Sequence, residues 1–218
     1  MPEMSSQVPS LKLDFCTFEA AKYAVEHWHY SKSMPAGKLV KIGVWEHNIY
    51  KGCVLFGRGA NYNLCKSFKL RQTECVELVR IALSKHKTPV SKIVSISLKM
   101  LSRQSPGVKL IVSYADTAQG HLGGIYKASN WIYTGESHSE SRIDPANGKV
   151  VHARSLFSKL GSVKGIPKVS NPVKHRYLYA LDPVLCETIL KLSKKYPTSV
   201  SSVAVAHETS SLKEAVQI

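Results

Sequence analysis

Three side chains able to take part in proton transfer lie close together within residues 109–133. An apolar run, residues 110–112, predicts a buried strand, and Asp116 follows where the sequence turns polar. A loop with three glycines carries His121, and Tyr126 falls on the short helix expected after it. Because open α/β sheets bind ligands beyond the carboxyl ends of their strands, we expect Asp116, His121 and Tyr126 near one edge of a sheet.

A second pair of reactive side chains, His29 and Tyr30, follows a helix predicted over residues 17–29. Thr17 can cap this helix, and an imidazole at its end could accept or relay a proton near neutral pH. Each candidate also has a structural interpretation, in which His29 finishes the helix, Asp116 caps the next turn and Tyr126 is core. The residues expected to face the core from this helix are Phe18, Ala21, Val25 and Trp28.

The remaining elements must place these residues around one sheet. Apolar runs at 39–45 and 49–57, joined by residues 46–48, predict a hairpin. Residues 74–83 predict a strand in which regular alternation puts Arg80 on one face with Val76 and Leu78. Glu77 and Arg80, charged within so apolar a run, must be paired or line a site. With helices at 92–104 and 186–195 and strands at 131–133 and 177–181, a mixed α/β sheet is the economical fold.

The basic loop 85–91 lies between a predicted strand and a predicted helix. Free backbone N–H groups and the helix dipole favour a phosphate at such a helix start. We therefore expect Lys87, Thr88 and Ser91 to bind the phosphate of a cofactor. The alternative is a capped helix start with solvated lysines.

The net charge is +15, from thirty Lys and Arg against fifteen Asp and Glu. Such an excess favours a polyanionic partner, of which nucleic acid is the commonest. Neither a signal peptide nor a membrane-spanning run is evident, so no membrane partner is expected. Five cysteines without a CxxC motif indicate reduced thiols in a cytosolic setting, more suited to the core than to zinc.

Residues 136–176 form a long basic insertion within an otherwise single domain, residues 1–195. The segment 144–148 is a turn signal that could close a hairpin, and a loop of this length is either functional or disordered. Residues 196–218 read as a tail that is poorly ordered or loosely docked. We expect the insertion to lie along DNA phosphates, and the residues assigned to DNA binding are Arg58, Lys149, Arg154, Lys164, Lys168, Lys174 and Arg176.

This order of elements resembles the GCN5-related N-acetyltransferase (GNAT) fold, although KHKTPVS stands where that family has a glycine-rich phosphate loop. A closer resemblance, over roughly residues 13–181, is to the Mom family of phage DNA-modification proteins. Several separated blocks carry it in the right order: WHYSKSMPAGKLVKIGVWE, VLFGRGA, ECVELVRIAL with KHKTP, SYADTAQGHLGGIYKASNWIYTG and KHRYLYALD.

The Mom resemblance implies an enzyme that converts adenine in duplex DNA to N6-carbamoylmethyladenine, in the host bacterial cytoplasm, and so shields DNA from restriction. It places catalysis on His29, Tyr30, Asp116 and Tyr126. Asp116 would accept the N6 proton, His29 would act as base or shuttle, and the tyrosines would orient the donor or stack on the extruded base. The same four residues could hold iron, with which the family is associated.

The donor of the added group stays open between an acyl-CoA-like molecule and a glycine-derived one, small or carrier-bound. Counting the base nitrogen, the added group is a glycinamide, so an acetyl donor would require both an oxidation and a nitrogen source. Two other functions remain: a conventional GNAT acetyltransferase using acetyl-CoA, and a non-catalytic DNA-binding protein. The sequence leaves the oligomeric state open, a homodimer included.

Overall fold

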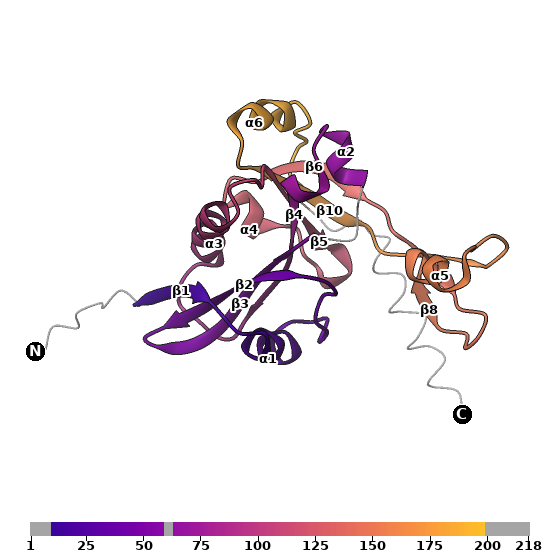
Figure 1. Ribbon diagram of the computed structural model, residues 1–218, viewed down its shortest axis with the longest axis horizontal. Coiled ribbons are helices and arrows are strands. Elements are labelled where there is room, and N and C mark those ends of the chain that lie inside the picture. Colours follow the sequence, from indigo (N-terminus) through magenta and orange to yellow (C-terminus); the bar gives the residue numbers. More distant parts are fainter. Residues whose placement is uncertain (1–9, 59–62, 199–218) are drawn as a thin grey trace, which may run out of the picture.

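The computed structural model describes residues 10–58 and 63–198, which form a seven-stranded mixed sheet with helices on both faces (Figure 1). Its strand order is β1-β2-β3-β4-β5-β10-β6. Neighbouring strands are antiparallel except β4 and β5, which are parallel. The strands are β1 (Leu11–Phe15), β2 (Leu39–Glu46), β3 (Ile49–Gly57), β4 (Cys75–Leu83), β5 (Leu110–Asp116), β6 (Ile132–Ser137) and β10 (Lys174–Ala180). The predicted α/β class with a mixed central sheet is confirmed.

One face of the sheet is covered by α3 (Val90–Gln104) and the short α4 (Gly124–Lys127). The other face is covered by α1 (Phe18–Trp28) over β3 and β4, and by α6 (Pro183–Leu190) over β5 and β10. The remaining short helices are α2 (Asn63–Ser67), η1 (Gln72–Glu74) and η2 (Thr117–Gln119). Both faces of the central strands are therefore buried, which explains their nearly continuous apolar sequences.

Local sequence signals set the start of α1 and the β2–β3 turn. The Thr17 hydroxyl accepts a hydrogen bond from the Ala20 N–H at 3.2 Å, as expected of its cap. His47 and Asn48 both have positive φ, 50° and 65°, which is the geometry of a tight hairpin turn. Phe18 differs from its prediction because it is 50% exposed. It lies one turn before Ala21, where the buried face of the helix begins.

Strand β4 contains a β-bulge that the sequence pattern did not reveal. Leu55 of β3 pairs with Arg80, whereas the next residue, Phe56, pairs with Leu78, so Val79 is an extra residue. Leu78 packs in the core beneath α3, while Arg80 lies opposite Leu55, which packs beneath α1. The predicted alternation of Leu78 and Arg80 on one face is therefore wrong, because the bulge moves Arg80 to the opposite face.

The insertion before β10 is folded, and residues 140–170 are called the small lobe below. It contains β7 (Glu140–Ile143), β8 (Val150–His152), α5 (Ala153–Leu160) and β9 (Lys168–Ser170), with the sheet order β8-β7-β9. In Figure 1 it stands to one side of the main sheet. The predicted turn closes the β7–β8 hairpin, since the Asp144 N–H donates to the Lys149 carbonyl at 2.8 Å.

The predicted tail begins on the core rather than away from it. The Tyr196 hydroxyl donates to the Trp131 carbonyl, and its ring lies 6.3 Å from that of Tyr133. The rest of the tail, from residue 199, lies outside the described residues, as do residues 59–62 of the loop after β3.

All five cysteines are free thiols, as expected. No helix in the described part of the chain is long and apolar enough to cross a membrane.

Candidate functional site

A cleft of about 630 Å³ opens where β4 and β5 separate. The two strands pair only from Cys75 with Leu110 to Glu77 with Val112, and then diverge. The cleft is bounded by the end of α1, the second half of β4, the end of β5 and the glycine loop before α4. Its lining includes Trp28, His29, Tyr30, Arg80, Tyr114, His121 and Tyr126. This is the sheet edge at which a ligand site was predicted.

His29 enters the cleft as a neutral hydrogen-bond donor. It ends α1, is 9% exposed, and its Nδ1 accepts the backbone N–H of Ser31 at 3.1 Å. An accepting Nδ1 places the ring proton of the neutral imidazole on Nε2. Burial, followed by the positive charge of Arg80, lowers the pKa of His29 to about 4. At neutral pH the ring therefore offers Nε2–H to a ligand, which suits stabilisation of a carbonyl oxygen better than removal of a proton.

Two phenols face the same cleft in different settings. Tyr30 is 47% exposed, with its ring centroid 4.3 Å from that of His29. Burial raises the pKa of Tyr30, the negative charge of Asp116 adds to this, and Arg80 opposes it. Tyr126 is buried, with its hydroxyl 2.7 Å from Ser113 Oγ, and burial raises its pKa to about 12. Both phenols are thus protonated at neutral pH, and Tyr30 presents an accessible ring face for stacking.

Arg80 supplies positive charge to the cleft, a role that the sequence left undecided. Its Nη1 donates to the Val79 carbonyl at 2.8 Å. Its Nε is buried and has no hydrogen-bond partner among the described residues. A buried guanidinium N–H without an acceptor is costly, so this group favours a ligand that carries an oxygen. The bulge at Val79 turns Arg80 toward this site, and regular alternation could not have revealed that.

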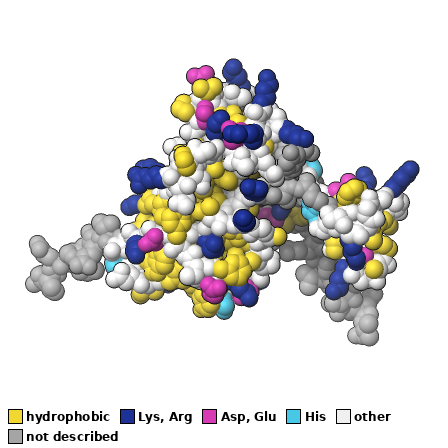
Figure 2. All heavy atoms as spheres, in the orientation of Figure 1, with side chains coloured by type: hydrophobic (Ala, Val, Ile, Leu, Met, Phe, Trp, Pro, Cys, Tyr) yellow, Lys and Arg dark blue, Asp and Glu magenta, His cyan; other side chains and the backbone are white. Residues whose placement is uncertain are grey.

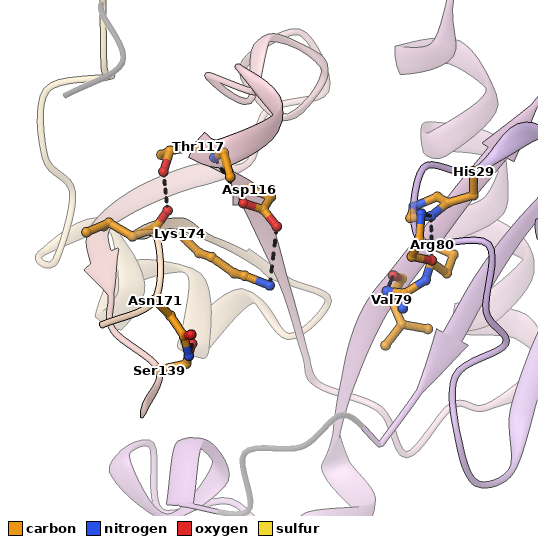
Figure 3. Close-up of polar contacts among 11 residues, drawn as sticks. His29, Val79, Arg80, Asp116, Thr117, Ser139, Asn171 and Lys174 are labelled. Carbon is orange, nitrogen blue, oxygen red and sulfur yellow. Dashed lines mark hydrogen bonds and ion pairs between the residues drawn. The ribbon is translucent and has the colours of Figure 1, made fainter. Parts of the chain in front are cut away.

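Asp116 lies beside the cleft rather than among its lining residues. One carboxylate oxygen accepts the Ala118 N–H at 3.1 Å, and the other lies 3.6 Å from Lys174 Nζ. Figure 3 shows the Asp116–Lys174 pair and the His29–Arg80 group as two separate clusters. The charge of Asp116 still acts on Tyr30, since it raises the pKa of that phenol. The structure thus brings His29, Tyr30 and Tyr126 to one cleft and leaves Asp116 at its side.

The glycine loop closes one wall of the cleft by packing against β10. Gly123 has φ 74°, and a Cβ there would lie 2.3 Å from Cζ of Tyr177. The Tyr177 hydroxyl donates to the Leu122 carbonyl at 2.7 Å, and its ring stacks on Tyr126 with centroids 4.7 Å apart. Tyr177 therefore fixes both the loop and Tyr126. Its place in a strand predicted over residues 177–181 did not reveal this contact.

A comparison with protein families matches residues 10–198 to the Mom protein family. The chain belongs to that family. A curated Mom relative, "Methylcarbamoylase mom" of Escherichia phage Mu, is 26% identical over 161 residues, covering 72% of this chain and 66% of the relative. The chain thus spans slightly less than two thirds of that relative's length.

Solved structures similar in fold to this Mom-family chain include acetyltransferases. A Bacillus subtilis acetyltransferase in complex with CoA shows 12% identity and a TM-score of 0.48, covering 80% of this chain and all of that one. The ribosomal-protein-S5-alanine acetyltransferase of Vibrio fischeri shows 9% identity and a TM-score of 0.47, covering 79% of this chain and 94% of that one.

The loop predicted to hold a cofactor phosphate binds a carboxylate of the Mom-family chain itself. The backbone N–H groups of Lys87 and Thr88 donate to Glu46 at 2.9 and 2.6 Å. Burial would raise the pKa of Glu46, but hydrogen bonds from Thr88 and Lys87 outweigh it and hold the pKa at about 2. Two of the backbone N–H groups expected to bind a phosphate, those of Lys87 and Thr88, are therefore already bonded to Glu46. Ser91 lies in the first turn of α3, after these two residues.

The four residues proposed for iron do not fit a ligand set as they are arranged. Tyr126, with a pKa near 12 and a hydroxyl bonded to Ser113, resists the deprotonation that iron ligation requires. Asp116 is directed to Lys174 and Ala118. No group of three His, Cys, Asp or Glu side chains within residues 10–58 and 63–198 could hold a metal ion.

The residues assigned to DNA binding are dispersed over the fold. Lys149, Lys164 and Lys168 are exposed on the small lobe, although Lys168 Nζ lies 3.5 Å from Glu140. Arg176 is held on the main sheet, where its Nε donates to Thr134 Oγ1 at 2.9 Å. Arg58 is exposed beside a separate pocket of about 420 Å³ at the other end of β4. Lys174 pairs with Asp116, and the Arg154 side chain lies outside what the structure describes.

Proposed function

We propose that this Mom-family protein is a transferase that modifies adenine in double-stranded DNA, forming N6-carbamoylmethyladenine and so protecting phage DNA from restriction in the host cytoplasm. The observation that carries the proposal is the cleft itself. Neutral His29, protonated Tyr30 and Tyr126 and the unpartnered Nε of Arg80 converge at the carboxyl end of β5. The curated relative's name, a methylcarbamoylase, supports the same reaction class.

The cleft residues suit a base that has been turned out of the duplex. An accessible phenol such as Tyr30 can stack on the extruded purine. His29 Nε2–H and Arg80 can donate to the carbonyl oxygen of the incoming group and stabilise negative charge that develops there. Tyr126, fixed by Ser113 and Tyr177, forms the rigid wall against which the group is positioned.

The transfer requires an acceptor for one proton of the N6 amino group. Nitrogen N6 forms a bond to the methylene carbon of the donor, the leaving group departs with the bonding electrons, and one N6 proton is released. His29 has its Nδ1 occupied and its Nε2 protonated, so it is poorly placed to accept this proton. Asp116 is the carboxylate beside the cleft, and it can accept the proton once Lys174 releases it. The donor is an acyl-CoA-like or glycine-derived molecule.

Mass spectrometry of nucleosides from cells expressing the protein tests this function. The wild-type protein should yield an adenine heavier by one carbamoylmethyl group, and Asp116→Ala should abolish it. Asp14→Ala is a matched control, because Asp14 is an exposed carboxylate on β1 that pairs with Lys12 at 3.5 Å. Unmodified nucleosides from the wild-type protein would indicate a non-catalytic DNA-binding protein, and N-acetylated product a conventional acetyltransferase.

Isotope labelling identifies the donor in the same system. If an acetyl-CoA-derived group is transferred, label from acetyl-CoA should appear in the modified base. If the donor derives from glycine, label from glycine should appear instead.

A further inference from the structure

The small lobe exposes large apolar side chains beyond what its own packing requires. Phe157 is 54% exposed, Leu160 45% and Val150 57%. Leu156, 1% exposed, is the fully buried hydrophobic residue of the described part of this lobe. Leu156 is thus buried, while Phe157, the next residue of α5, is exposed to solvent. Figure 2 shows hydrophobic and cationic side chains together on this lobe. Three large apolar side chains exposed among basic residues, on so thin a core, favour a contact with a partner.

The charge around these apolar residues has one sign. Residues 145–173 contain five Lys and Arg and not one Asp or Glu. The two acidic residues that precede them in the lobe are already paired, Asp144 with Lys159 at 2.9 Å and Glu140 with Arg142 at 2.5 Å. The lobe as a whole holds six Lys and Arg against these two acids, so it presents phenylalanine and leucine in a net positive field.

Duplex DNA fits this combination better than a second copy of the chain. A two-fold symmetric contact would set this net positive surface against itself, and the like charges would repel. DNA offers phosphates to the lysines and stacked base edges to an apolar side chain. Proteins that kink DNA combine basic groups with a wedge such as Phe or Leu, which enters between base steps.

The root of the lobe is fastened to the end of β5, beside the cleft. The Thr117 hydroxyl donates to the Val173 carbonyl at 2.5 Å, and Asn171 Nδ2 donates to Ser139 Oγ at 3.0 Å across the two connecting segments. The Lys174–Asp116 pair completes this connection (Figure 3). A duplex bound by the lobe would therefore be bound by a unit joined directly to β5, the strand that ends at Asp116.

We propose that Phe157 is a wedge that inserts into the duplex and unstacks a base step, so that the target base can leave the helix. The proposal rests on the proposed function in taking duplex DNA as the partner. In this proposal α5 unstacks the duplex before the group is transferred, so the unstacking step requires no group donor.

The test is binding of purified full-length protein to a duplex containing 2-aminopurine, whose fluorescence rises when it is unstacked, in the absence of any donor. Phe157→Ala should remove most of the fluorescence increase and weaken binding by roughly tenfold. The salt dependence of binding should stay that of the wild type, because no phosphate contact is lost. Phe157→Leu should restore part of both signals. Phe18→Ala is the matched control, because Phe18 is 50% exposed at the start of α1.

Three outcomes would overturn the wedge. Phe157→Ala could leave fluorescence and affinity unchanged, it could act no differently from Phe18→Ala, or it could convert a dimer to a monomer with DNA affinity intact. The last result would assign the surface to a second copy of the chain. Since no donor is present, an unstacking signal lost in Phe157→Ala supports the wedge even if the protein transfers nothing to adenine. A failed wedge likewise leaves the nucleoside analysis unaffected.

Discussion

Lys174 Nζ lies 3.6 Å from Asp116 Oδ2, and the two residues are also partners in the β5–β10 register. This contact joins the carboxylate proposed to accept the N6 proton to the segment that carries the small lobe. The lysine side chain is 41% exposed, so a DNA phosphate can compete for it. In the proposed function, docking of DNA and release of Asp116 would thus be coupled through one ammonium group.

Lys174→Gln should therefore separate binding from turnover. Loss of a half-exposed pair should change the free energy of unfolding by less than about 1 kcal/mol. Affinity for duplex DNA should fall, while the rate at saturating DNA should rise by up to about fivefold because Asp116 no longer has to be released. Lys168→Gln, which removes a pair with Glu140 in the lobe, should weaken binding without raising that rate. A rate as low as that of Asp116→Ala would show instead that Lys174 positions the carboxylate.

Exposed lysines of the small lobe should set the salt dependence of DNA binding. Lys164→Glu with Lys168→Glu should weaken binding and reduce the slope of log K against log salt by roughly 2, one phosphate contact for each lysine. The control is Lys12→Glu with Lys22→Glu, the same charge change on β1 and α1, where both lysines are exposed. Equal slopes for the two double variants, measured by fluorescence anisotropy, would place the duplex elsewhere.

The lowered pKa of His29 should appear as a pH dependence of stability. The ordinary pKa of 6.5 applies to the unfolded chain, and about 4 to the folded one. As pH falls from 6.5 to 4, the unfolded chain gains a proton that the folded chain excludes. The free energy of unfolding should therefore fall by up to about 3 kcal/mol over this range, with no such effect above it. Urea unfolding at several pH values measures this.

His29→Asn should flatten that profile, whereas His27→Asn, at an exposed position on the same helix, should leave it steep. Parallel profiles for the two variants would show that His29 titrates normally.

Glu46 should stabilise the start of α3 by holding two backbone N–H groups. Glu46→Ala should cost about 1–3 kcal/mol at neutral pH, because buried donors lose their acceptor. Glu46 contributes its full stabilisation above pH 4.5, the ordinary pKa of the carboxyl, and this contribution is lost as pH falls toward about 2, its pKa in the folded chain. The free energies of unfolding of the variant and the wild type should therefore converge at low pH. Glu26→Ala, at an exposed residue of α1, is the control.

The same variant tests the predicted anion site. If the 85–91 loop has the geometry of a phosphate cradle, inorganic phosphate should raise the melting temperature of Glu46→Ala and leave that of the wild type unchanged. An equal response of both proteins would locate phosphate binding outside this loop.

Gly123→Ala should damage the cleft wall far more than Gly120→Ala. Both glycines have positive φ, 74° and 67°, so each substitution costs about 1–2 kcal/mol in backbone strain. Only at Gly123 would the new Cβ also strike Tyr177, adding about 1–3 kcal/mol, since Gly120 has nothing within 4 Å. Chemical denaturation of both variants gives the difference. Similar losses would mean that Tyr177 moves aside without cost.

Local sequence patterns predicted most elements of the main sheet. The β2–β3 hairpin and β5 were evident because short polar segments interrupt apolar runs of strand length. The small lobe was not foreseen as a folded unit, since polar contacts such as Arg142–Glu140 and Lys159–Asp144 hold it together with a single fully buried leucine. Apolar periodicity carries no signal for such an arrangement.

The site was less predictable, because its residues meet through contacts distant in the sequence. Glu46 reaches the loop of Thr88 across 42 residues, and Tyr177 reaches Leu122 across 55. The grouping of His29 and Tyr30 with Tyr126 came from the family resemblance, not from spacing. Arg80 stayed ambiguous because its direction depends on one unpaired residue, Val79, in an otherwise regular strand.

That unpaired residue makes the direction of Arg80 depend on how β4 is paired. With Val79 left out of the ladder, Arg80 lies opposite Leu55, on the face covered by α1. If Val79 were instead paired in regular alternation, Arg80 would share the face of Leu78, and its guanidinium would enter the hydrocarbon interior beneath α3. The chemistry available at this edge thus depends on strand register as well as on the kind of amino acid.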